Sequence, residues 1–350
     1  MPRIVLFGHS GGEHLKNFIP MKEKSNNDYH TFNLSQAINN RYMPWNDGEH
    51  YRKFMKAYGK YISSLNKPPL LGDITFWGEW EPATTFETIN YTNDSIKDNI
   101  ISIIRNSKRP KYLHHVYKIK KESGVYLQNT DPYVFGDNFF YTNCKQRGEM
   151  IRLQKGDIIL FGTPGKVFNK ETVYMELDTV FVVGDNTIHI NKSDYPQFNK
   201  FSDEKYQIFK NVVLEKIFER LNKKNGQYFI TDTEKKFIIY KGATYDNPVN
   251  EMFSFVPCQA FNTDTEKCSF GKIILTENIF GHFLKINLKP INTPNFNYNG
   301  ITILEAFKNH IDSKEDDITL TKKFWQLIVS TVFEQGCYLG VWIKEPALIK

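Results

Sequence analysis

Signals for secretion, for membrane insertion and for a cysteine-based site are lacking in this sequence of 350 residues. No run approaches the roughly 18–20 apolar residues of a membrane span. The N-terminal MPRIVLFGHSGG has neither the long apolar region nor the cleavage site of a signal peptide. The four cysteines are widely scattered without a CxxC pair, which indicates neither a disulfide framework nor a four-thiolate zinc site. We therefore expect a reduced, cytoplasmic protein with no membrane partner.

Signatures of catalysis and of nucleotide binding are also missing. A strand predicted over residues 3–8 leads into a glycine-rich turn with His9 and His14, but the turn matches neither GxGxxG nor GxxxxGK[ST]. His114 and His115 have no HxH, HExxH or HxxxH spacing, and adjacent histidines on a strand point to opposite faces. The sequence thus indicates no metal site, and it leaves a cofactor, a reaction and the oligomeric state open.

The composition is that of a folded protein rich in aromatic residues. Apolar residues make up 40% and charged residues 24% of the chain, which is ordinary for a globular protein. Aromatic residues reach 15%, and rings in such number usually fill a core. The length allows two domains. We predict a β-rich domain with an N-terminal strand and helices over residues 1–185, and an α+β domain over residues 201–350.

Helical periodicity occurs in five segments. Apolar residues spaced i, i+3, i+4 predict an amphipathic helix over residues 47–65, with Asp47 as N-cap and Pro68-Pro69 after its end. Similar patterns predict helices over 95–106, 203–223 and 302–310. A longer helix is predicted from Thr321, with Gly336 directly after its C-terminal cap.

Apolar runs bounded by turn residues predict the strands. They cover residues 73–77, 158–162, 173–183, 228–230, 237–240, 252–256, 272–275, 284–288 and 338–343. The pair 158–162 and 173–183 follows the tight turn Lys155-Gly156-Asp157 and indicates a hairpin or a barrel meander. We therefore predict the α+β class: a central antiparallel β-barrel-like or mixed sheet with flanking helices, followed by an α+β C-terminal part.

Positive charge is concentrated in one part of the chain. No acidic residue lies between Asp98 and Glu122, whereas this interval contains seven cations: Arg105, Lys108, Arg109, Lys111, Lys118, Lys120 and Lys121. The net charge of the whole chain is +6, so the remainder carries about −1. Tyr112, His114, His115 and Tyr117 lie among these cations, a mixture that suits phosphates and bases. Arg109, Lys111 and Tyr112 are therefore ligand-binding candidates, and a solvated basic face is the alternative.

The segment 72–84 contains two tryptophans and two carboxylates. Glu79 and Glu81 flank Trp80, and residues two apart on an extended chain point the same way. Such a pair can share a proton or bind a cation, so Glu79 is a candidate catalytic residue; a solvated strand end is the alternative. Trp77 and Trp80 are candidates for lining a ligand pocket, together with Tyr112 and Asn143.

A polar run at residues 142–147 holds further candidates. Asn143 and Gln146 can read the edge of a base, Lys145 suits a phosphate, and Cys144 beside two cations is a candidate nucleophile. A base for Cys144, such as His115, cannot be paired with it from the sequence, and a structural or exposed cysteine is the alternative.

Two aspartates complete the set of candidate catalytic residues. Asp131 stands at a turn before Pro132. Asp178 interrupts the apolar strand predicted over 173–183, where a buried carboxylate needs a partner. It is either a hydrogen-bonded structural acid or an acid of the site.

The strand pair resembles a known core. LQKGDIILFGTPG followed by MELDTVFVVG resembles the PUA-like superfamily of small β-barrels, which includes the ASCH and EVE types. The start IVL…GG with the later GD-apolar-FG strand is also similar to nucleotide-modification-associated domains of bacteria and phages. The matching residues are 155–161 and 178–183, which are 13 of the 350 residues of the chain. The resemblance implies binding of RNA or modified bases, or association with base-modifying enzymes and phage defence; no catalytic residue carries over.

Three hypotheses about function follow. The first is a nucleic-acid or nucleotide-binding protein, with the basic segment on phosphates. The second is a nucleotide- or nucleic-acid-processing enzyme whose polar groups converge on one cavity: Glu79, His115, Asp131, Asn143, Cys144 and Asp178. The third is a protein-interaction module without chemistry.

Overall fold

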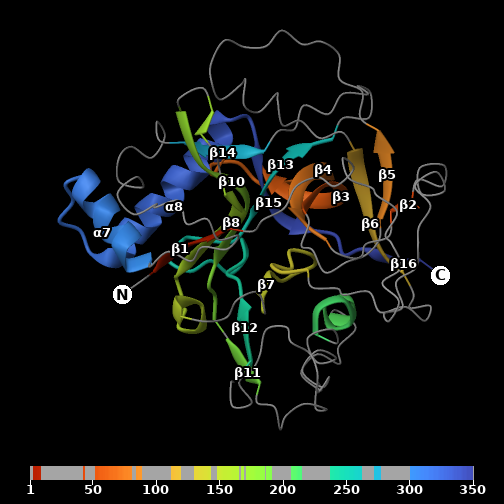
Figure 1. Ribbon diagram of the computed structural model, residues 1–350, viewed down its shortest axis with the longest axis horizontal. Coiled ribbons are helices and arrows are strands. Elements are labelled where there is room, and N and C mark those ends of the chain that lie inside the picture. The colour runs from red at the N-terminus through yellow and green to blue at the C-terminus, as the bar shows by residue number, and fades with distance from the viewer. Residues whose placement is uncertain are drawn as a thin grey trace.

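A fold of the α+β class, dominated by sheet, is seen in the computed structural model (Figure 1). The structure describes residues 3–8, 42–43, 52–80, 84–88, 112–119, 130–142, 148–164, 167–168, 171–185, 187–190, 206–214, 237–261, 272–276 and 300–349. Among these residues, no helix combines the length and the apolar character that crossing a membrane requires.

The first sheet is built on the strand pair that the sequence predicted at its centre. Its strands in spatial order are β1 (Ile4–Gly8), β8 (Ile158–Pro164), β10 (Glu171–Val182) and β14 (Ile273–Thr276), and β9 (Val167–Phe168) pairs with the start of β10. β1 and β8 are parallel, and the other pairs are antiparallel. The predicted strands at 3–8, 158–162 and 173–183 are confirmed, and the sheet that they form is mixed.

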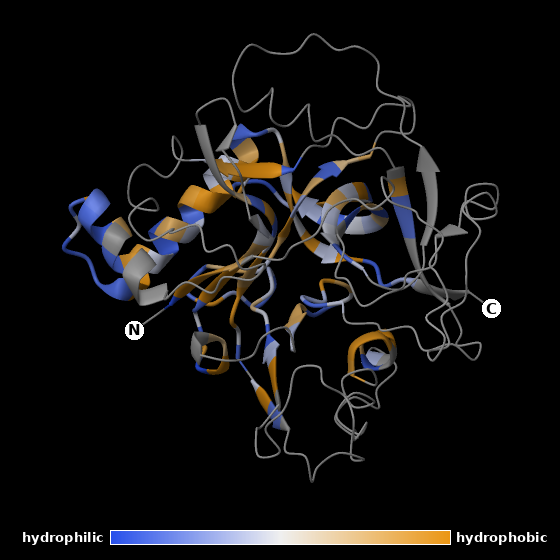
Figure 2. Ribbon diagram, viewed as in Figure 1, coloured by the Kyte–Doolittle hydropathy of each residue, from blue (hydrophilic) through white to orange (hydrophobic). Residues whose placement is uncertain are grey.

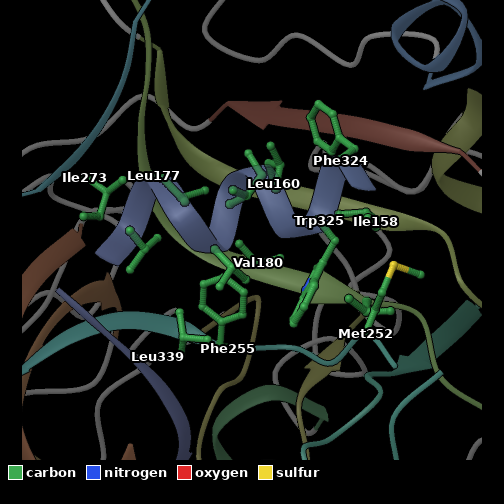
Figure 3. Close-up of a cluster of buried hydrophobic side chains, with 14 of the residues drawn as sticks. Ile158, Leu160, Leu177, Val180, Met252, Phe255, Ile273, Phe324, Trp325 and Leu339 are labelled. Carbon is green, nitrogen blue, oxygen red and sulfur yellow. The ribbon is translucent and has the colours of Figure 1, made fainter. Parts of the chain in front are cut away.

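Helix α8 (Asp317–Glu334) covers one face of this sheet, and α7 (Gly300–His310) lies beside it (Figures 1 and 3). Phe324 and Trp325 of α8 share a buried cluster with Leu160 and Val180 of the sheet. The indole Nε1 of Trp325 donates to the Phe253 carbonyl at 3.1 Å. Figure 2 shows hydrophobic residues gathered where α8 meets the strands, so burial of apolar surface holds the two layers together.

Aromatic side chains pack on the opposite face of the first sheet. A second, small sheet lies there, with β12 (Phe237–Lys241) between β11 (Ile188–Ile190) and β7 (Phe140–Tyr141). The rings of Tyr141 and Tyr240 stack with centroids 5.8 Å apart. A helical segment adds Phe209, which stacks on Phe140 at 4.2 Å. That segment, α3 (Gln207–Phe209) with a π-helical continuation (Lys210–Leu214), is the described part of the helix predicted over 203–223.

Four strands close into a ring, which we call the strand ring. They are β3 (Arg52–Ile62), β4 (Leu70–Glu79), β13 (Val256–Ala260) and β15 (Tyr338–Ile343). Each pairs antiparallel with the next, and β15 returns to β3. The ring closes tightly: a Cβ at Gly59 would lie 2.7 Å from Ile74 Cδ1, and a Cβ at Gly340 would lie 2.9 Å from Val256 Cγ2. The predicted barrel-like element therefore exists, but in these strands rather than in β8 and β10.

Further strands extend the sheet of the strand ring beyond β3. They are β6 (Tyr112–Ile119), β5 (Thr84–Thr88), β2 (Tyr42–Met43) and β16 (Ala347–Ile349). β6 runs parallel to β3 and antiparallel to β5, β2 pairs with β5, and β16 is parallel to the second half of β6. The basic segment of the sequence thus includes a strand inside a sheet.

The helix predicted over 47–65 is wrong, because residues 52–62 form the strand β3. Phe54 and Ile62 belong to one buried cluster, whereas Met55 and Tyr61 belong to the other. Apolar residues therefore lie on both faces of the strand, and their spacing along it also fits a helical period. Pairing with β4, β15 and β6 decides in favour of the strand.

Two predicted helices and one predicted strand begin elsewhere. α8 starts at Asp317 rather than Thr321, because the carboxylate of Asp316 accepts from the N–H groups of Ile318 and Thr319 as an N-cap. α7 starts at Gly300 instead of residue 302. The strand predicted over 252–256 is wrong for residues 252–255, because β13 (Val256–Ala260) shares only residue 256 with it.

The predicted end of α8 and four predicted strands are confirmed. Gly336 has φ +74°, and its N–H donates to the Phe333 carbonyl while that of Cys337 donates to Val332. The strands predicted at 73–77, 237–240, 272–275 and 338–343 correspond to β4, β12, β14 and β15. The helix predicted at 95–106 and the strands predicted at 228–230 and 284–288 lie outside the described residues.

Strands from both sides of residue 185 pair in every sheet. β14 pairs with β10, β12 pairs with β7, and β13 pairs with β4. The main-chain bridge between Val180 and Phe255, with two N–H···O bonds of 2.9 Å, also connects β10 to the segment before β13. The segments 1–185 and 201–350 therefore share their sheets.

Candidate functional site

A buried ion pair lies on the ring of Trp77, and we call these three residues the junction cluster: Trp77, Glu176 and Lys272. Lys272 Nζ lies 2.9 Å from Glu176 Oε2 and 3.7 Å from the centroid of the Trp77 ring. Phe54 packs against the same indole with ring centroids 4.6 Å apart. Trp77, Glu176 and Lys272 are all at most 9% exposed. Away from water, the ammonium is held by a carboxylate and by an aromatic face.

The junction cluster lies where the first sheet meets the strand ring. Trp77 comes from β4, Glu176 comes from β10, and Lys272 directly precedes β14. On β8, Thr163 is the register partner of Glu176. Among the residues that the structure describes, the buried hydroxyls of Thr163 and Thr276 and the indole N–H of Trp77 have no hydrogen-bond partner. Within the described part of the chain, the cluster therefore has at least one buried hydroxyl without a hydrogen-bond partner, that of Thr163, on the neighbouring strand.

Glu79 and His115 lie on the same sheet face as Trp77. Residues two apart on β4 lie on the same face, so the side chains of Trp77 and Glu79 share a face. Phe54 is the register partner of Trp77, Lys56 lies two residues further along β3, and His115 is the partner of Lys56. Glu79 is buried, whereas His115 is half-buried. This face thus leads from a buried carboxylate past an indole to an accessible imidazole.

Lys56 borders the accessible end of this face. Its Nζ lies 3.5 Å from Asp73 Oδ2 and 3.7 Å above the centroid of the Phe261 ring. His114, the neighbour of His115, pairs in register with Met55 and faces the other side of the sheet, where it is buried. Only one imidazole of the adjacent pair therefore belongs to this face.

Trp80 and Asp131 lie apart from Trp77. Trp80 packs edge-on against Phe135 with ring centroids 5.0 Å apart, in the other buried cluster. Asp131 is fully buried, and its Oδ1 accepts from the Thr142 N–H at 2.8 Å. The two tryptophans therefore belong to different buried clusters, and Asp131 ties together the two ends of the segment 131–142.

Asp178 lies in the irregular part of β10. The register of β10 on β8 shifts between Leu177 and Thr179, so Asp178 is the extra residue of a bulge. Its side chain is 1% exposed, two residues from Glu176 of the junction cluster. A bulge re-aims one side chain without breaking the strand, which accounts for an acid inside an apolar run.

Asp157, in the segment that resembles PUA-like proteins, has a structural role. Its two carboxylate oxygens accept from the N–H groups of Arg3 at 2.7 Å and Gln154 at 2.8 Å, so it connects β1 to the turn before β8. Burial raises the pKa of Asp157 to about 6, and these donors together with the Arg3 guanidinium lower the pKa only in part. This carboxylate is used by the fold rather than by an accessible site.

Several sequence-predicted site residues lie outside the described residues. They are Arg109, Lys111, Asn143, Cys144, Lys145 and Gln146, and Tyr112 is described only as the first residue of β6. Within the described ranges, no group of three or more His, Cys, Asp or Glu side chains is arranged to hold a metal ion.

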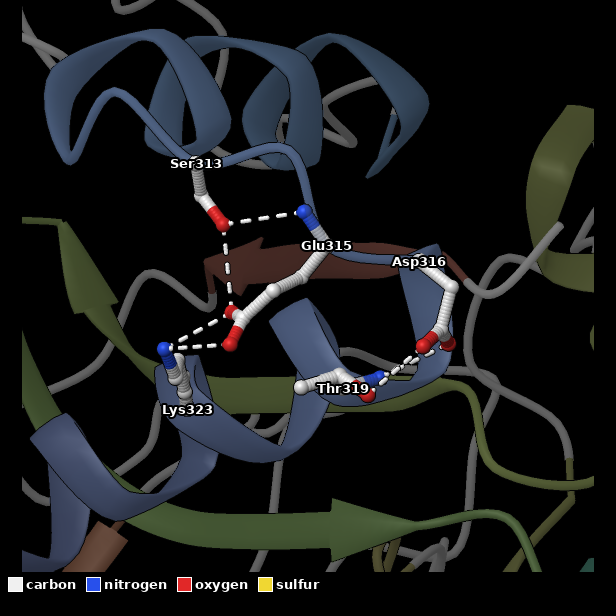
Figure 4. A network of polar contacts seen from close by, with 5 residues as sticks. All are labelled: Ser313, Glu315, Asp316, Thr319 and Lys323. Atoms are coloured by element: carbon white, nitrogen blue, oxygen red, sulfur yellow. Dashed lines mark hydrogen bonds and ion pairs between the residues drawn. The ribbon is translucent and has the colours of Figure 1, made fainter.

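An open pocket of about 660 Å³ lies at the turn between α7 and α8, away from these residues. Figure 4 shows the polar side chains at this turn. Glu315 borders it, where it pairs with Lys323 at 2.7 Å and accepts from the Ser313 hydroxyl at 3.1 Å. The hydrogen bond from Lys323 is the main reason why the pKa of Glu315 is lowered. These polar groups satisfy one another, and no side chain in the network points to a particular ligand.

Sequence reasoning missed Glu176 and Lys272, which are 96 residues apart and have no common motif. The only local signal at either position was a charged residue next to an apolar run, as in Lys272 before Ile273. Comparison with known proteins adds no relative: no family model, no curated protein and no solved structure matches this chain.

Proposed function

We propose that this chain binds nucleic acid along the neighbouring strands β3 and β6. The observation that carries the proposal is their parallel pairing. Residues 50–72, which include β3, have five cations and no acid, and residues 99–121, which include β6, have seven cations and no acid. The net charge of the whole chain is +6, so the remainder carries −6. Two separate basic stretches of the chain thus meet in one sheet.

The described side chains between these strands suit a nucleic acid. Lys56 and His115 are register partners, both are half-buried, and Lys56 lies against the Phe261 ring. Cations supply the sequence-independent affinity for phosphates, and rings next to them supply surfaces for bases. The resemblance to PUA-like proteins points to the same class of ligand, because those families bind RNA or modified bases.

The test is a charge reversal in the basic stretch around β6. Arg109→Glu with Lys111→Glu should lower the affinity for a single-stranded or duplex oligonucleotide by more than about tenfold at low salt. The slope of log K against log salt should also become smaller by about 0.7–0.9 for each lost phosphate contact. Fluorescence anisotropy over a salt series measures both quantities.

The matched control makes the same charge change elsewhere. Lys155 and Lys314 are exposed and belong neither to β3 nor to β6. Lys155→Glu with Lys314→Glu should leave affinity and salt slope close to wild type. Equal losses in both double variants would mean that only net charge matters, and unchanged affinity in the first would refute the proposal.

A second candidate is a nucleotide- or nucleic-acid-processing enzyme, favoured by the common face of Trp77, Glu79 and His115. Its test is His115→Asn, because the half-buried imidazole can be replaced without creating a large cavity. Loss of turnover of an oligonucleotide or nucleotide, with binding retained, would favour the enzyme. If the wild type shows no turnover, the enzyme hypothesis is refuted and only the binding function remains.

A further inference from the structure

The tip of the β3–β4 hairpin, residues 63–71, exposes apolar side chains. Leu65, Leu70 and Leu71 are 46%, 47% and 61% exposed, and Tyr58 beside them is 43% exposed. These are four of the seven large hydrophobic side chains with such exposure among the described residues. Exposed apolar side chains that are concentrated in one short segment mark a place of interaction more often than single exposed residues do.

The hairpin tip is apolar on both sides. Leu70 and Leu71 are successive residues of β4 and therefore point to opposite faces. Pro68 and Pro69 precede them and have no backbone N–H that would lose its water on insertion. Such a shape fits an environment that surrounds it better than a flat partner surface.

Positive charge accompanies the hairpin tip. Residues 58–72 contain Lys60 and Lys67 and no acidic residue, and Lys60 Nζ lies 3.6 Å from the exposed carboxylate of Asp246. Because β3 and β6 are parallel, the tip after β3 and the C-terminal end of β6 lie at the same end of the sheet. The sequence continues from Ile119 into Lys120 and Lys121. The apolar tip thus has one cation on β3 and one in the turn. It lies at the end of the sheet toward which the basic strand β6 also runs.

We propose that the hairpin tip is a wedge that inserts Leu65, Leu70 and Leu71 between base steps of a nucleic-acid duplex. Apolar wedges of Leu and Pro unstack base steps in this way, and a two-stranded ribbon is narrow enough for a groove. Lys60 and Lys67 contact the adjacent phosphates. This inference rests on the proposed function and adds to it the class of nucleic acid and the mode of contact.

The experiment uses DNA and RNA duplexes, each with one 2-aminopurine, whose fluorescence rises when its base is unstacked. Anisotropy reports binding and 2-aminopurine fluorescence reports insertion, so the two are separate readouts. The wild type should give both signals. Leu70→Ser with Leu71→Ser should bind about tenfold more weakly and lose the 2-aminopurine rise, because the wedge is gone while the cations remain.

The control is Ile311→Ser with Ile318→Ser, which removes two other exposed side chains, 37% and 50% exposed, near the α7–α8 turn. It should match the wild type in both readouts. An increase in anisotropy without an increase in 2-aminopurine fluorescence would refute the wedge but not the proposed function. If the wild type gives no increase in anisotropy, both the wedge and the proposed function are refuted. Leucine-dependent binding to phosphatidylserine vesicles in that case would assign the tip to a membrane surface instead.

Discussion

The first sheet and the strand ring are both buried, but they are completed in different ways. The first sheet is open, and other elements cover its faces: α8 on one side and the aromatic rings around β7 and β12 on the other. The strand ring closes on itself, because β15 pairs with both β13 and β3. Its interior is filled by its own side chains, and the closest approaches require glycine at 59 and 340.

The first sheet and the strand ring hold their buried polar side chains in different places. In the first sheet, the buried carboxylate of Asp157 accepts from the backbone N–H groups of Arg3, before β1, and Gln154, before β8. In the strand ring, Glu79 and Thr75 face outward with Trp77, where the ring meets Glu176 and Lys272. One region therefore uses a carboxylate to hold its own chain ends. The other is joined to its neighbour where Lys272, which is ion-paired with Glu176 in the first sheet, lies on the ring of Trp77.

Substitution of Lys272 should have the largest effect on stability. Lys272→Met leaves Glu176 buried without its ammonium partner, and loss of one member of a buried pair costs about 3–5 kcal/mol. The additional substitution Glu176→Met should restore most of this loss, since an apolar pair needs no counter-charge. Urea unfolding, analysed for both midpoint and m-value, measures the change.

The control for this prediction is an exposed ion pair. Lys322 Nζ lies 2.6 Å from Glu251 Oε2, but the Glu251 side chain is 79% exposed. Lys322→Met should therefore cost about 1 kcal/mol or less. Similar losses from Lys272→Met and Lys322→Met would contradict the prediction that burial makes the ion pair of the junction cluster costly to break.

The pH dependence of stability should report on Asp157. Its pKa is raised by burial from 3.8 to about 6 in the folded protein, so its stabilising contribution is complete below pH 3.8 and lost as the pH rises through 6. The change is at most about 3 kcal/mol, at 1.36 kcal/mol for each pKa unit. Asp157→Asn removes this titration, so the wild type should gain stability relative to the variant on going from pH 7 to pH 4.

The exposed Asp185 supplies the control, because Asp185→Asn changes the same chemical group at the surface. Its stability relative to wild type should vary little over the same range. A constant difference between wild type and Asp157→Asn from pH 4 to pH 7 would contradict the buried titration.

A methyl group inside the strand ring should have a smaller effect. The Cβ of Gly59→Ala would lie 2.8 Å from the Trp342 carbonyl, which belongs to the backbone, so we expect a loss of about 1–3 kcal/mol. Gly72 is the register partner of Gly59 and has no neighbour closer than 4.0 Å. Gly72→Ala should stay within about 0.5 kcal/mol of wild type. Equal effects at both positions, measured by thermal unfolding, would show that ring closure does not depend on glycine.

Part of the candidate site could be predicted from the sequence. Trp77, Glu79 and His115 were singled out by residue type, but the strand was predicted to end at residue 77. Only the extension of β4 to Glu79 puts this carboxylate on the same face as Trp77. Their relation to His115 depends on the register of β6 on β3, which joins residues about sixty apart. Trp80 could not be separated from Trp77 in advance, because only packing against Phe135 assigns it to the other cluster.

By itself, the sequence determined the elements that have local signals and the local excess of positive charge. The turn at Gly156 before β8 and the glycine that ends α8 are examples, since a left-handed residue is recognisable from its neighbours. Only the tertiary structure decided that residues 52–62 are a strand, that β15 closes a ring and that Lys272 is the partner of Glu176. These features depend on contacts between distant parts of the chain. Such contacts stabilise the fold by burying surface, but they produce no periodic pattern of residues within any one segment.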